Sequence, residues 1–318
     1  MISFKEFLLR KFCASLYLFF YSLIMVTAIC GQTKTIAVTI DDLPLNGPRI
    51  PLVDLQRMTK QLLETFRKNN VPVVGFVNES LLFLDGETDQ RIALLRSWSD
   101  SGVELGNHTF SHLGFRDNSL QKYEDDFIRG DAVTRRIQKE KHTRFFRHPF
   151  LQMGPTPEAE AAFEKFIGER GYRIAPVTVS TMDWMFLAAY RNAIEKGDGS
   201  AIKKVSEDYL RFVEASIESR EKASENLFGR QISHILLLHA NELNGENLDR
   251  LFAMLKSRGY QFVTLETALK DPLYVFPEKY TPTSDWIQHW AFSKGKKIDS
   301  PQPPDYVRKA YDQAQIKK

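Results

Sequence analysis

The segment TIAVTIDD at residues 35–42 is a short run rich in β-branched residues that ends in two adjacent carboxylates. Six further β-rich runs follow it, at residues 71–77, 103–107, 143–147, 172–179, 232–239 and 260–265. Between the runs lie stretches with apolar residues three and four positions apart, as in amphipathic helices, at residues 52–68, 89–100, 120–141, 157–170, 200–226 and 247–258. Seven strands alternating with helices favour an α/β fold with parallel strands, either a barrel or a doubly wound sheet.

Polar residues follow most of these strands. They are Asp41-Asp42, the stretch NHTFSH at residues 107–112, the stretch RHPF at residues 147–150, Asp183-Trp184 and His239. In a barrel of parallel strands the carboxyl ends share one face, so residues that are distant in the sequence would converge on one mouth. The sequence therefore predicts the functional site at this mouth.

The overall composition excludes several classes of protein. Of the 318 residues, 43% are hydrophobic and 26% are charged, which is typical of a globular protein and not of a disordered or multi-spanning membrane chain. The net charge of +3 provides no broad basic surface, so we expect no nucleic-acid partner. The two cysteines, Cys13 and Cys30, are too few for a disulfide framework or a four-cysteine zinc site. Any metal would be held by His and carboxylate side chains.

The two ends of the chain differ from its middle. Residues 1–31 have a basic start followed by an apolar run at residues 12–29, the layout of a signal peptide, although the run is also long enough for an uncleaved membrane anchor. We therefore expect export to the periplasm or the cell surface. Residues 32–272 form the predicted domain. Residues 273–318, rich in proline and aromatic residues, are predicted to pack as an extension on the barrel, with a role in shaping the substrate or binding a partner as the alternative.

Two histidines four residues apart, His108 and His112, indicate a metal site when they are taken together with the carboxylates expected at the same mouth. Two imidazoles and one carboxylate oxygen form a three-ligand metal site that leaves positions open for water and substrate. Each polar feature alone also has a plainer interpretation: Asp41-Asp42 as a turn, His239 as a hydrogen-bonded core histidine, Asp183-Trp184 as a helix N-terminus. Their combination at one mouth indicates a catalytic site.

In order and spacing these motifs resemble those of the polysaccharide deacetylases with a NodB homology domain, carbohydrate esterase family 4. The family motif T-F-D-D is similar to Thr39-Ile40-Asp41-Asp42, H-[ST]-x-x-H to residues 108–112, R-x-P-[YF] to residues 147–150, and L-x-H to residues 237–239. The motif D-x-x-D-W is matched in part, because Ser180 stands where its first Asp would be. The resemblance extends over about residues 35–270. It implies a NodB-like, distorted (β/α)₇ barrel, a single domain with a C-terminal tail.

The resemblance also implies roles for the residues on the first strands. Asp42, His108 and His112 would bind a divalent metal, zinc in most members of the family and cobalt or another divalent ion in others. Asp41 would be the general base that takes a proton from water, and Arg147 would hold it in place. These assignments come from the resemblance and await the geometry of the fold.

Further roles are implied on the later strands. His239 would be the general acid that protonates the leaving amine, and Asp183 would orient it. The backbone N–H of Phe150 would help to hold the oxyanion, while Trp184 and Leu237 would form the apolar walls that receive the acetyl methyl group. We expect activity to survive the serine at position 180, with an effect on substrate shape or local positioning.

The implied activity is hydrolytic release of acetate from a glycan of the cell envelope, N-acetylated or, as the less favoured alternative, O-acetylated. A barrel glycoside hydrolase with a carboxylate pair stays possible, but it leaves both histidines of the 108–112 motif without a role. A catalytically silent glycan-binding or scaffold protein also stays possible, although loss of activity should first erase Asp41 and His239. An acetylated poly- or oligosaccharide is the expected partner, and the membrane would be one only through residues 12–29. The sequence does not indicate an oligomeric state.

Overall fold

The computed structural model describes residues 33–44, 50–138, 144–275, 280–281, 283 and 285–316. The expected signal peptide or anchor at residues 1–31 lies outside the described residues. From Lys34 onward the described residues form one compact unit. In this part of the chain no helix combines the length and hydropathy needed to cross a membrane.

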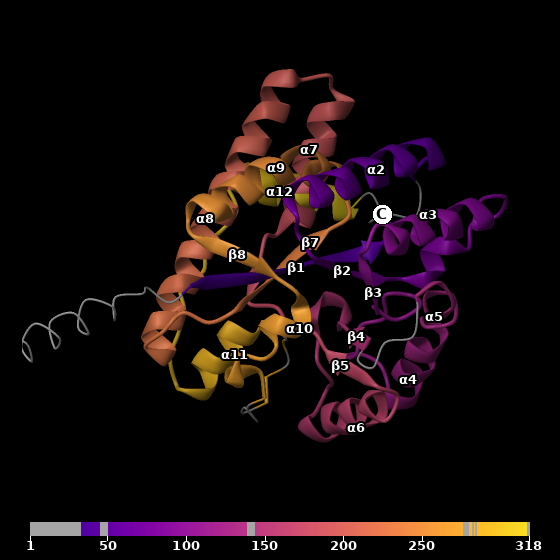
Figure 1. Cartoon of the computed structure of the whole chain (residues 1–318). Helices are drawn as coiled ribbons and strands as arrows, with labels where there is room; N and C mark the ends of the chain where they lie inside the picture. Colours follow the sequence, from indigo (N-terminus) through magenta and orange to yellow (C-terminus); the bar gives the residue numbers. More distant parts are fainter. Residues whose placement is uncertain are drawn as a thin grey trace, which may run out of the picture. The chain divides into compact units, whose positions relative to one another are not determined.

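An eight-stranded parallel sheet forms the centre of this unit (Figure 1). The strands are β1 (Lys34–Leu43), β2 (Val73–Val77), β3 (Glu104–Asn107), β4 (Arg144–Phe146), β5 (Tyr172–Ile174), β6 (Val179–Ser180), β7 (His234–His239) and β8 (Tyr260–Val263). Their order is β5-β4-β3-β2-β1-β7-β6, and β8 pairs with β1 beside this row. The predicted α/β class with parallel strands is confirmed.

The strand β1 lies inside the row and pairs with three other strands. Its first residues pair with β8, its middle with β7 and its last with β2. In the pairing with β7, Asp41 is in register with His239. The two strand ends therefore bring an acidic and a basic side chain to the same edge of the sheet.

The barrel is distorted between β5 and β6, the two ends of the row, which a short connection joins. The sequence pattern predicts one strand over residues 172–179, and this prediction was wrong, because Pro176 has no N–H to donate to a strand ladder. The N–H of Ala175 donates to the carbonyl of Phe146 at 2.7 Å, and that of Thr178 donates to Ile235 at 3.0 Å. The connection thus bonds to β4 on one side and to β7 on the other.

Helices surround the strands, as Figure 1 shows. The longer ones are α2 (Leu52–Asn69), α3 (Thr88–Asp100), α4 (Leu120–Arg129), α6 (Pro157–Gly168), α7 (Asp183–Glu195), α8 (Gly199–Phe228), α9 (Glu242–Ser257), α11 (Trp286–Ser293) and α12 (Asp305–Ile316). The shorter ones are α5 (Thr134–Ile137), α10 (Leu265–Ala268) and the 3₁₀ turns η1 (Glu79–Leu82), η2 (Pro149–Leu151) and η3 (Pro272–Val275).

One expected helix is interrupted close to the mouth. The pattern over residues 120–141 predicts a single helix, whereas α4 ends at Arg129 and α5 begins at Thr134. A Cβ at Gly130 would lie 2.6 Å from backbone atoms of Thr109 and Phe110, so a side chain there would collide with that loop. Gly130 therefore lets the end of α4 approach the loop that carries both predicted histidine ligands.

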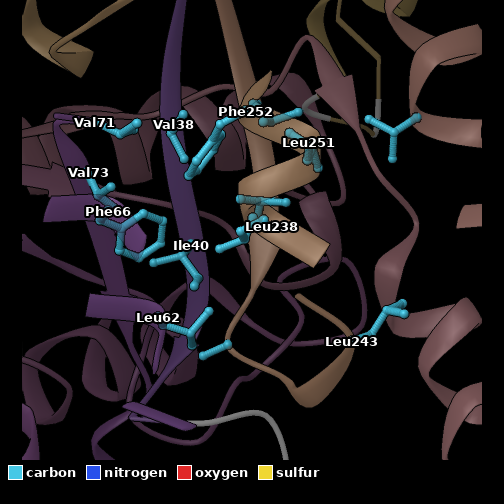
Figure 2. Close-up of a cluster of buried hydrophobic side chains, with 14 of the residues drawn as sticks. Val38, Ile40, Leu62, Phe66, Val71, Val73, Leu238, Leu243, Leu251 and Phe252 are labelled. Atoms are coloured by element: carbon cyan, nitrogen blue, oxygen red, sulfur yellow. The ribbon is translucent and has the colours of Figure 1, made fainter. Parts of the chain in front are cut away.

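Alternate residues of β1 face opposite sides of the strand, and this division separates core from site. Val38 and Ile40 join a buried cluster with Phe66 of α2 (Figure 2). Full burial of each such side chain contributes about 1.5–3 kcal/mol to stability. Thr39 and Asp41 point to the other side and are buried as well. The same strand thus anchors the core and carries polar groups toward the mouth.

The C-terminal region folds within the same compact unit. Trp290 of α11 is buried in a cluster with Leu227 of α8 and Tyr274, and Val307 of α12 is buried in the main core. The compact unit continues through residue 272, so a boundary between domain and extension at that point stays a prediction.

Candidate metal and catalytic site

Three side chains that could bind a metal meet at the carboxyl ends of β1 and β3. Asp42 lies on β1, and His108 and His112 follow β3. Oδ1 of Asp42 lies 3.7 Å from Nε2 of His108 and 3.5 Å from Nε2 of His112. The ligand-type atoms of the three residues all lie within 4.8 Å of one another, so the group could hold a metal ion.

The hydrogen bonding of these side chains also fits a divalent ion. Oδ1 of Asp42 is buried and has no hydrogen-bond partner. Nδ1 of His108 donates to the carbonyl of Arg147 at 2.8 Å, which leaves the lone pair on Nε2. Two atoms bound at about 2.1 Å to one tetrahedral ion lie about 3.4 Å apart. The separations between Asp42 and the two imidazoles are close to this value.

Burial keeps both imidazoles in the neutral form that metal binding requires. Burial, assisted by the neighbouring His112, lowers the pKa of His108 well below its usual value. Burial also lowers the pKa of His112, although the charge of Asp42 opposes this shift. Both side chains are therefore available as ligands at neutral pH.

Left-handed backbone conformations are concentrated around the mouth. Apart from Asn70 at a helix end, every non-glycine residue with positive φ in the described part of the chain either lines the cavity defined below or lies between two of its lining residues. These residues are Asp42 (φ 64°), Thr109 (61°), His112 (57°), Phe150 (56°), Leu151 (53°) and Met182 (49°). Such conformations cost free energy and persist where the surrounding structure enforces them, commonly at functional sites.

Asp41 lies beside the metal-binding group and is held by a buried arginine. Its Oδ1 accepts a hydrogen bond from Nη1 of Arg147 at 2.9 Å, and its Oδ2 lies 3.6 Å from Nε2 of His108. Arg147 also donates to the hydroxyl of Thr39 at 2.6 Å and to the carbonyl of Ala175 at 3.1 Å. Burial raises the pKa of Asp41 to about 6, although the charges of Arg147 and His239 favour the carboxylate. A carboxylate in this range is suited to act as a base near neutral pH.

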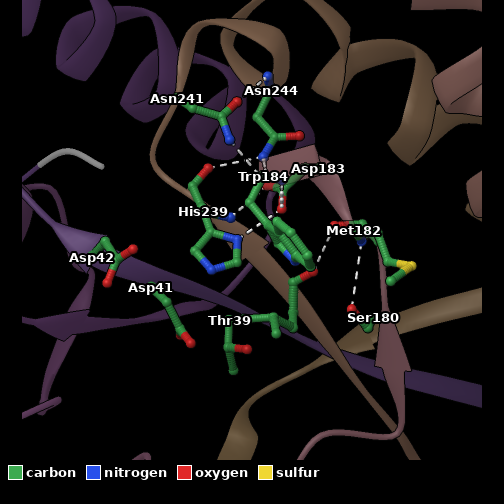
Figure 3. A network of polar contacts seen from close by, with 12 residues as sticks. Thr39, Asp41, Asp42, Ser180, Met182, Asp183, Trp184, His239, Asn241 and Asn244 are labelled. Atoms are coloured by element: carbon green, nitrogen blue, oxygen red, sulfur yellow. Dashed lines mark hydrogen bonds and ion pairs between the residues drawn. The ribbon is translucent and has the colours of Figure 1, made fainter. Parts of the chain in front are cut away.

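Across the mouth, His239 at the end of β7 pairs with Asp183 at the start of α7 (Figure 3). Nδ1 of His239 donates to Oδ1 of Asp183 at 2.7 Å, and the backbone N–H of His239 donates to Oδ2 at 2.7 Å. Burial disfavours the imidazolium, but the charge and hydrogen bond of Asp183, together with the charges of Asp42 and Asp41, raise the pKa of His239 to about 9. His239 is therefore protonated at neutral pH, and Nε2 is the nitrogen left for a substrate.

Two asparagines at the start of α9 complete the surroundings of Asp183 (Figure 3). Nδ2 of Asn241 donates to Oδ2 of Asp183 at 3.1 Å. Asn244 donates to the same oxygen and, at 2.8 Å, to the carbonyl of His239. Oδ1 of Asn241 accepts from the N–H of Asn244 at 2.9 Å and so caps α9. Burial would raise the pKa of Asp183, but the charge and hydrogen bonds of His239, together with the hydrogen bond from Asn244, lower it.

A cavity of about 830 Å³ joins the two groups. Its lining includes Asp41, Asp42, His108, His112, His239, Phe150, Trp184 and Leu237. Arg147 and Asp183 do not line it and act on it through Asp41 and His239. Phe150 is 64% exposed, and the centre of its ring lies 4.3 Å from the centre of the His112 ring. The structure thus gathers all the residues expected at the mouth around one cavity.

Ser180 lies in the cavity lining as well. Its hydroxyl accepts a long hydrogen bond of 3.4 Å from the N–H of Met182. Asp183, three residues later, keeps its contacts to His239 with the serine in place. The departure from the family motif at position 180 therefore leaves the Asp183–His239 pair intact.

The sequence did not point to two residues that hold this site. Thr39 precedes the two aspartates as part of a motif, yet its hydroxyl accepts from Arg147 and donates to the carbonyl of Leu236 at 2.6 Å. A threonine directed into a buried strand interior is the signal that could have identified it, because a buried hydroxyl needs partners. Asn244 lies within a helix and gives no comparable signal.

Comparison with known proteins shows similarity to one family over part of the chain. Residues 28–163 match the family model described as polysaccharide deacetylase. The chain is 24% identical over 251 residues to the peptidoglycan-N-acetylglucosamine deacetylase PgdA of Listeria monocytogenes, an alignment that covers 79% of this chain and 42% of the relative. The chain therefore spans less than half the length of that curated relative.

Solved structures share the fold. A chitin deacetylase from the fungal pathogen Colletotrichum lindemuthianum superposes with a TM-score of 0.51 and 21% identity, over 76% of this chain and 90% of that chain. A carbohydrate esterase family 4 pseudoenzyme from Bacillus anthracis superposes with a TM-score of 0.52 and 17% identity, over 75% of this chain and 66% of that chain. The expected distorted barrel is confirmed. Because one of these proteins is named an enzyme and the other a pseudoenzyme, the fold alone does not decide activity.

Proposed function

We propose that this chain, part of which matches the polysaccharide deacetylase family model, is a metal-dependent hydrolase that releases acetate from an N-acetylated glycan. The observation that carries the proposal is the cavity itself, which joins a possible metal site and an arginine-bound Asp41 to an aspartate-bound His239. Between about pH 6 and about pH 9 Asp41 is ionised while His239 is protonated. A base and an acid are therefore available together at neutral pH.

On the first side of the cavity, Asp41 takes a proton from the attacking water. Arg147 fixes the carboxylate through Oδ1, which leaves Oδ2 directed toward the metal-binding group. Held by Asp42, His108 and His112, a divalent ion would polarise the acetyl carbonyl and lower the pKa of water. We propose zinc, because two imidazoles and one carboxylate are a ligand set that zinc accepts, and cobalt or another divalent ion would substitute for it.

On the second side, His239 donates its Nε2 proton to the amide nitrogen as the bond between carbonyl carbon and nitrogen breaks. Asp183 holds the ring through Nδ1 and stabilises its protonated form. The water oxygen becomes part of acetate, and the sugar leaves as a free amine. The backbone N–H of Phe150 donates to the oxyanion, and Trp184 and Leu237 enclose the acetyl methyl group.

The proposed substrate is a glycan of the cell envelope. The Listeria relative is named for N-acetylglucosamine of peptidoglycan, which supports an N-acetyl group on an extracytoplasmic polymer as the target here. The basic start and apolar run of residues 1–31 support export of the protein. We propose that this segment is either removed as a signal peptide or kept as a membrane anchor through residues 12–29. An O-acetylated glycan is the alternative substrate of the same site.

The two competing functions are less well supported by the geometry. A glycoside hydrolase gives no role to the imidazoles of His108 and His112, which burial keeps neutral beside Asp42. A silent scaffold gives no reason for a buried base and a buried acid that each keep a complete set of partners. Turnover is therefore the property to measure.

The test is acetate release from N-acetylglucosamine oligomers and from peptidoglycan, by the purified chain as isolated, after chelation and after addition of zinc or cobalt. We expect release to vanish on chelation and to return with metal. Asp41→Asn should bind metal and release no acetate, while Asp89→Asn, on the exposed start of α3, should behave as the unmodified chain. Metal binding without release from any substrate would contradict the proposal.

A further inference from the structure

The loop at residues 148–154 follows β4 and carries Phe150, whose backbone N–H is the proposed donor to the oxyanion. Phe150 and Leu151 both have left-handed backbone conformations, with φ of 56° and 53°. Such conformations persist only where the surrounding structure enforces them. Contacts made by other residues must therefore hold the loop in this shape.

One buried carboxylate, that of Glu160 on α6, is bonded to both ends of this loop. Its Oε1 accepts from Nε2 of His148 at 3.1 Å, and its Oε2 accepts from the backbone N–H of Gly154 at 2.6 Å. Glu160 is 4% exposed and His148 is 1% exposed, so water does not compete for these bonds. Because the two donors are the first and last residues of the loop, Glu160 fixes the separation of its ends, with Phe150 between them.

The imidazole of His148 is also held on its other side. Its Nδ1 is hydrogen-bonded at 2.9 Å to the hydroxyl of Tyr123 on α4, which is fully buried. The centre of its ring lies 5.0 Å from that of Phe146 and 5.5 Å from that of Phe163. Both ring nitrogens thus have partners and aromatic rings pack around them, which fixes the orientation of the side chain.

The far end of the loop is shaped for the same bond. A Cβ at Gly154 would lie 2.9 Å from the ring of Phe115 and 3.0 Å from the backbone nitrogen of Glu160, so the absence of a side chain lets this residue approach α6. Burial alone would raise the pKa of Glu160, but the charge and hydrogen bond of His148 and the N–H of Gly154 lower it. Hydrogen bonds to such an ionised carboxylate are stronger than those between neutral groups.

Arg147, directly before the loop, has anchors of its own. Its backbone N–H donates to the carbonyl of Asn107 at 3.0 Å, and its side chain donates to Asp41 at 2.9 Å. The base and the metal-binding group therefore keep their contacts without Glu160. The residues after Arg147, and Phe150 above all, are the ones that depend on it.

From these contacts we infer that Glu160, through His148 and Gly154, is a positioning residue that holds the N–H of Phe150 where the oxyanion forms. His148 lies in the lining of the cavity, and Glu160 lies behind it, out of reach of a substrate. The effect on the reaction rests on the proposed function. The effect on the loop does not, because it can be measured without a substrate.

The first test is backbone amide hydrogen exchange, measured by mass spectrometry on peptides that cover residues 150–154. Glu160→Leu removes both hydrogen bonds at similar side-chain size. His148→Asn retains an amide near Tyr123 but is too short to reach Glu160. Both variants should exchange about tenfold faster in this segment, the size expected for loss of one or two hydrogen bonds. Peptides covering residues 104–112 should exchange at the rate of the unmodified chain.

The second test is the kinetics of acetate release from N-acetylglucosamine oligomers by the zinc-loaded variants. A displaced oxyanion donor raises the barrier of the chemical step, so kcat should fall by about 10- to 100-fold in Glu160→Leu. The KM and the affinity for zinc should change little, because Asp41 and the metal-binding group keep their contacts. The bridge between Gln152 and Thr283 also remains, so the loss should be smaller than removal of the donor would cause.

Two variants separate position from general stability. Glu160→Gln should restore most of kcat, because its amide oxygen can accept from Gly154 while its NH₂ group donates to a His148 ring whose proton is on Nδ1. Ile167→Ala removes a buried apolar side chain two turns later on α6, with no loss of a side-chain hydrogen bond. It should lower stability and leave both kcat and the exchange of residues 150–154 unchanged.

The exchange and kinetic results fail independently. Unchanged exchange of residues 150–154 in His148→Asn, and in Glu160→Leu if that variant folds, would overturn the inference whatever the activity. Faster exchange in a chain that releases no acetate would support the role of Glu160 and contradict the proposed function instead. A fall of kcat in Ile167→Ala as large as that in His148→Asn would show that stability and not loop position sets the rate, and would also overturn the inference.

Discussion

The two sides of the catalytic mouth are built in different ways. On the side of β1 and β3, the metal-binding side chains stand directly at the ends of strands, Asp42 on β1 and His108 and His112 after β3. On the side of β7 and α7, the partners of the strand-end histidine come from helices, Asp183 from the start of α7 and Asn244 from within α9. The possible metal site is thus fixed by the pairing of parallel strands. The His239 site is fixed by how whole helices pack.

Different interactions also hold the two sides. Asp42 and His112 occupy left-handed backbone conformations, which the surrounding fold has to enforce. Asp183 instead accepts hydrogen bonds from Asn241 and Asn244 of α9 and from the backbone N–H at the end of β7. A substitution on the first side should therefore remove a ligand outright, whereas substitutions on the second side should tune the acidity of His239 step by step.

The largest effect is expected at the metal-binding group. Asp42→Ala removes the carboxylate ligand, and acetate release should fall to background, because a bound divalent ion supplies several kcal/mol of transition-state stabilisation. Metal content measured by mass spectrometry on the purified variant should fall in parallel. Asp89→Ala is the matched control. A variant that loses metal but keeps its activity would show that Asp42, His108 and His112 are not the site of the reaction.

The next effect is expected at the opposite side. His239→Gln keeps a polar side chain of similar size but removes the proton donor, so kcat should fall by about 10²- to 10³-fold, in the range of general acid catalysis. Metal content and the KM for oligomers should change little, because neither depends on this proton. Steady-state kinetics beside metal analysis checks the prediction. A loss of metal in this variant would mean that the two sides are coupled and not separate.

A smaller and more specific effect is expected for Asp183→Asn. In the unmodified chain His239 must be protonated, so activity should fall as the pH rises through about 9. Without the charge of Asp183 the pKa of His239 drops, and the alkaline limb of the profile should move to lower pH, with kcat near neutral pH reduced about tenfold. The pH profile of kcat is the measurement, with Asp312→Asn as control. An unchanged alkaline limb would show that another group sets it.

The same difference explains how much the sequence could predict. The residues of the first side could be predicted from the sequence. Short motifs at strand ends encode them, and parallel strands bring these ends together. On the second side, His239 and Asp183 were readable as motif residues, but the support from Asn244 was not, since it depends on where α9 packs against α7. The residues of α12 that line the cavity are predictable only in general terms, as a tail that shapes the substrate, because periodicity predicts helices and not the surfaces they meet.

The errors in the predicted elements have different causes. A run of β-forming residues over 172–179 favours one strand, but Pro176 divides it. Apolar periodicity over 120–141 favours one helix, but the helix ends where the Thr109 backbone approaches Gly130. The first break comes from a residue within the run and the second from a contact with a distant segment, and both lie next to residues that line or support the mouth.

The smallest effect on activity is expected at Thr39 of β1, whose hydroxyl supports Arg147 on the first side of the mouth. Thr39→Val keeps the shape of the side chain but removes the hydroxyl that accepts from Arg147 and donates to Leu236. Two buried groups lose a partner, so the free energy of unfolding should fall by about 1–3 kcal/mol, as measured by urea denaturation. Asp41 keeps its own bond to Arg147, so acetate release should fall only a few-fold.

Thr39→Ser is the matched variant, because it retains the hydroxyl and loses only a methyl group. It should lie close to the unmodified chain in stability and activity. If Thr39→Ser were as unstable as Thr39→Val, packing and not hydrogen bonding would account for the loss. If Thr39→Val instead abolished turnover while metal stayed bound, Arg147 would depend on Thr39 to hold Asp41, and the first side would rest on a chain of supporting hydrogen bonds as much as the second.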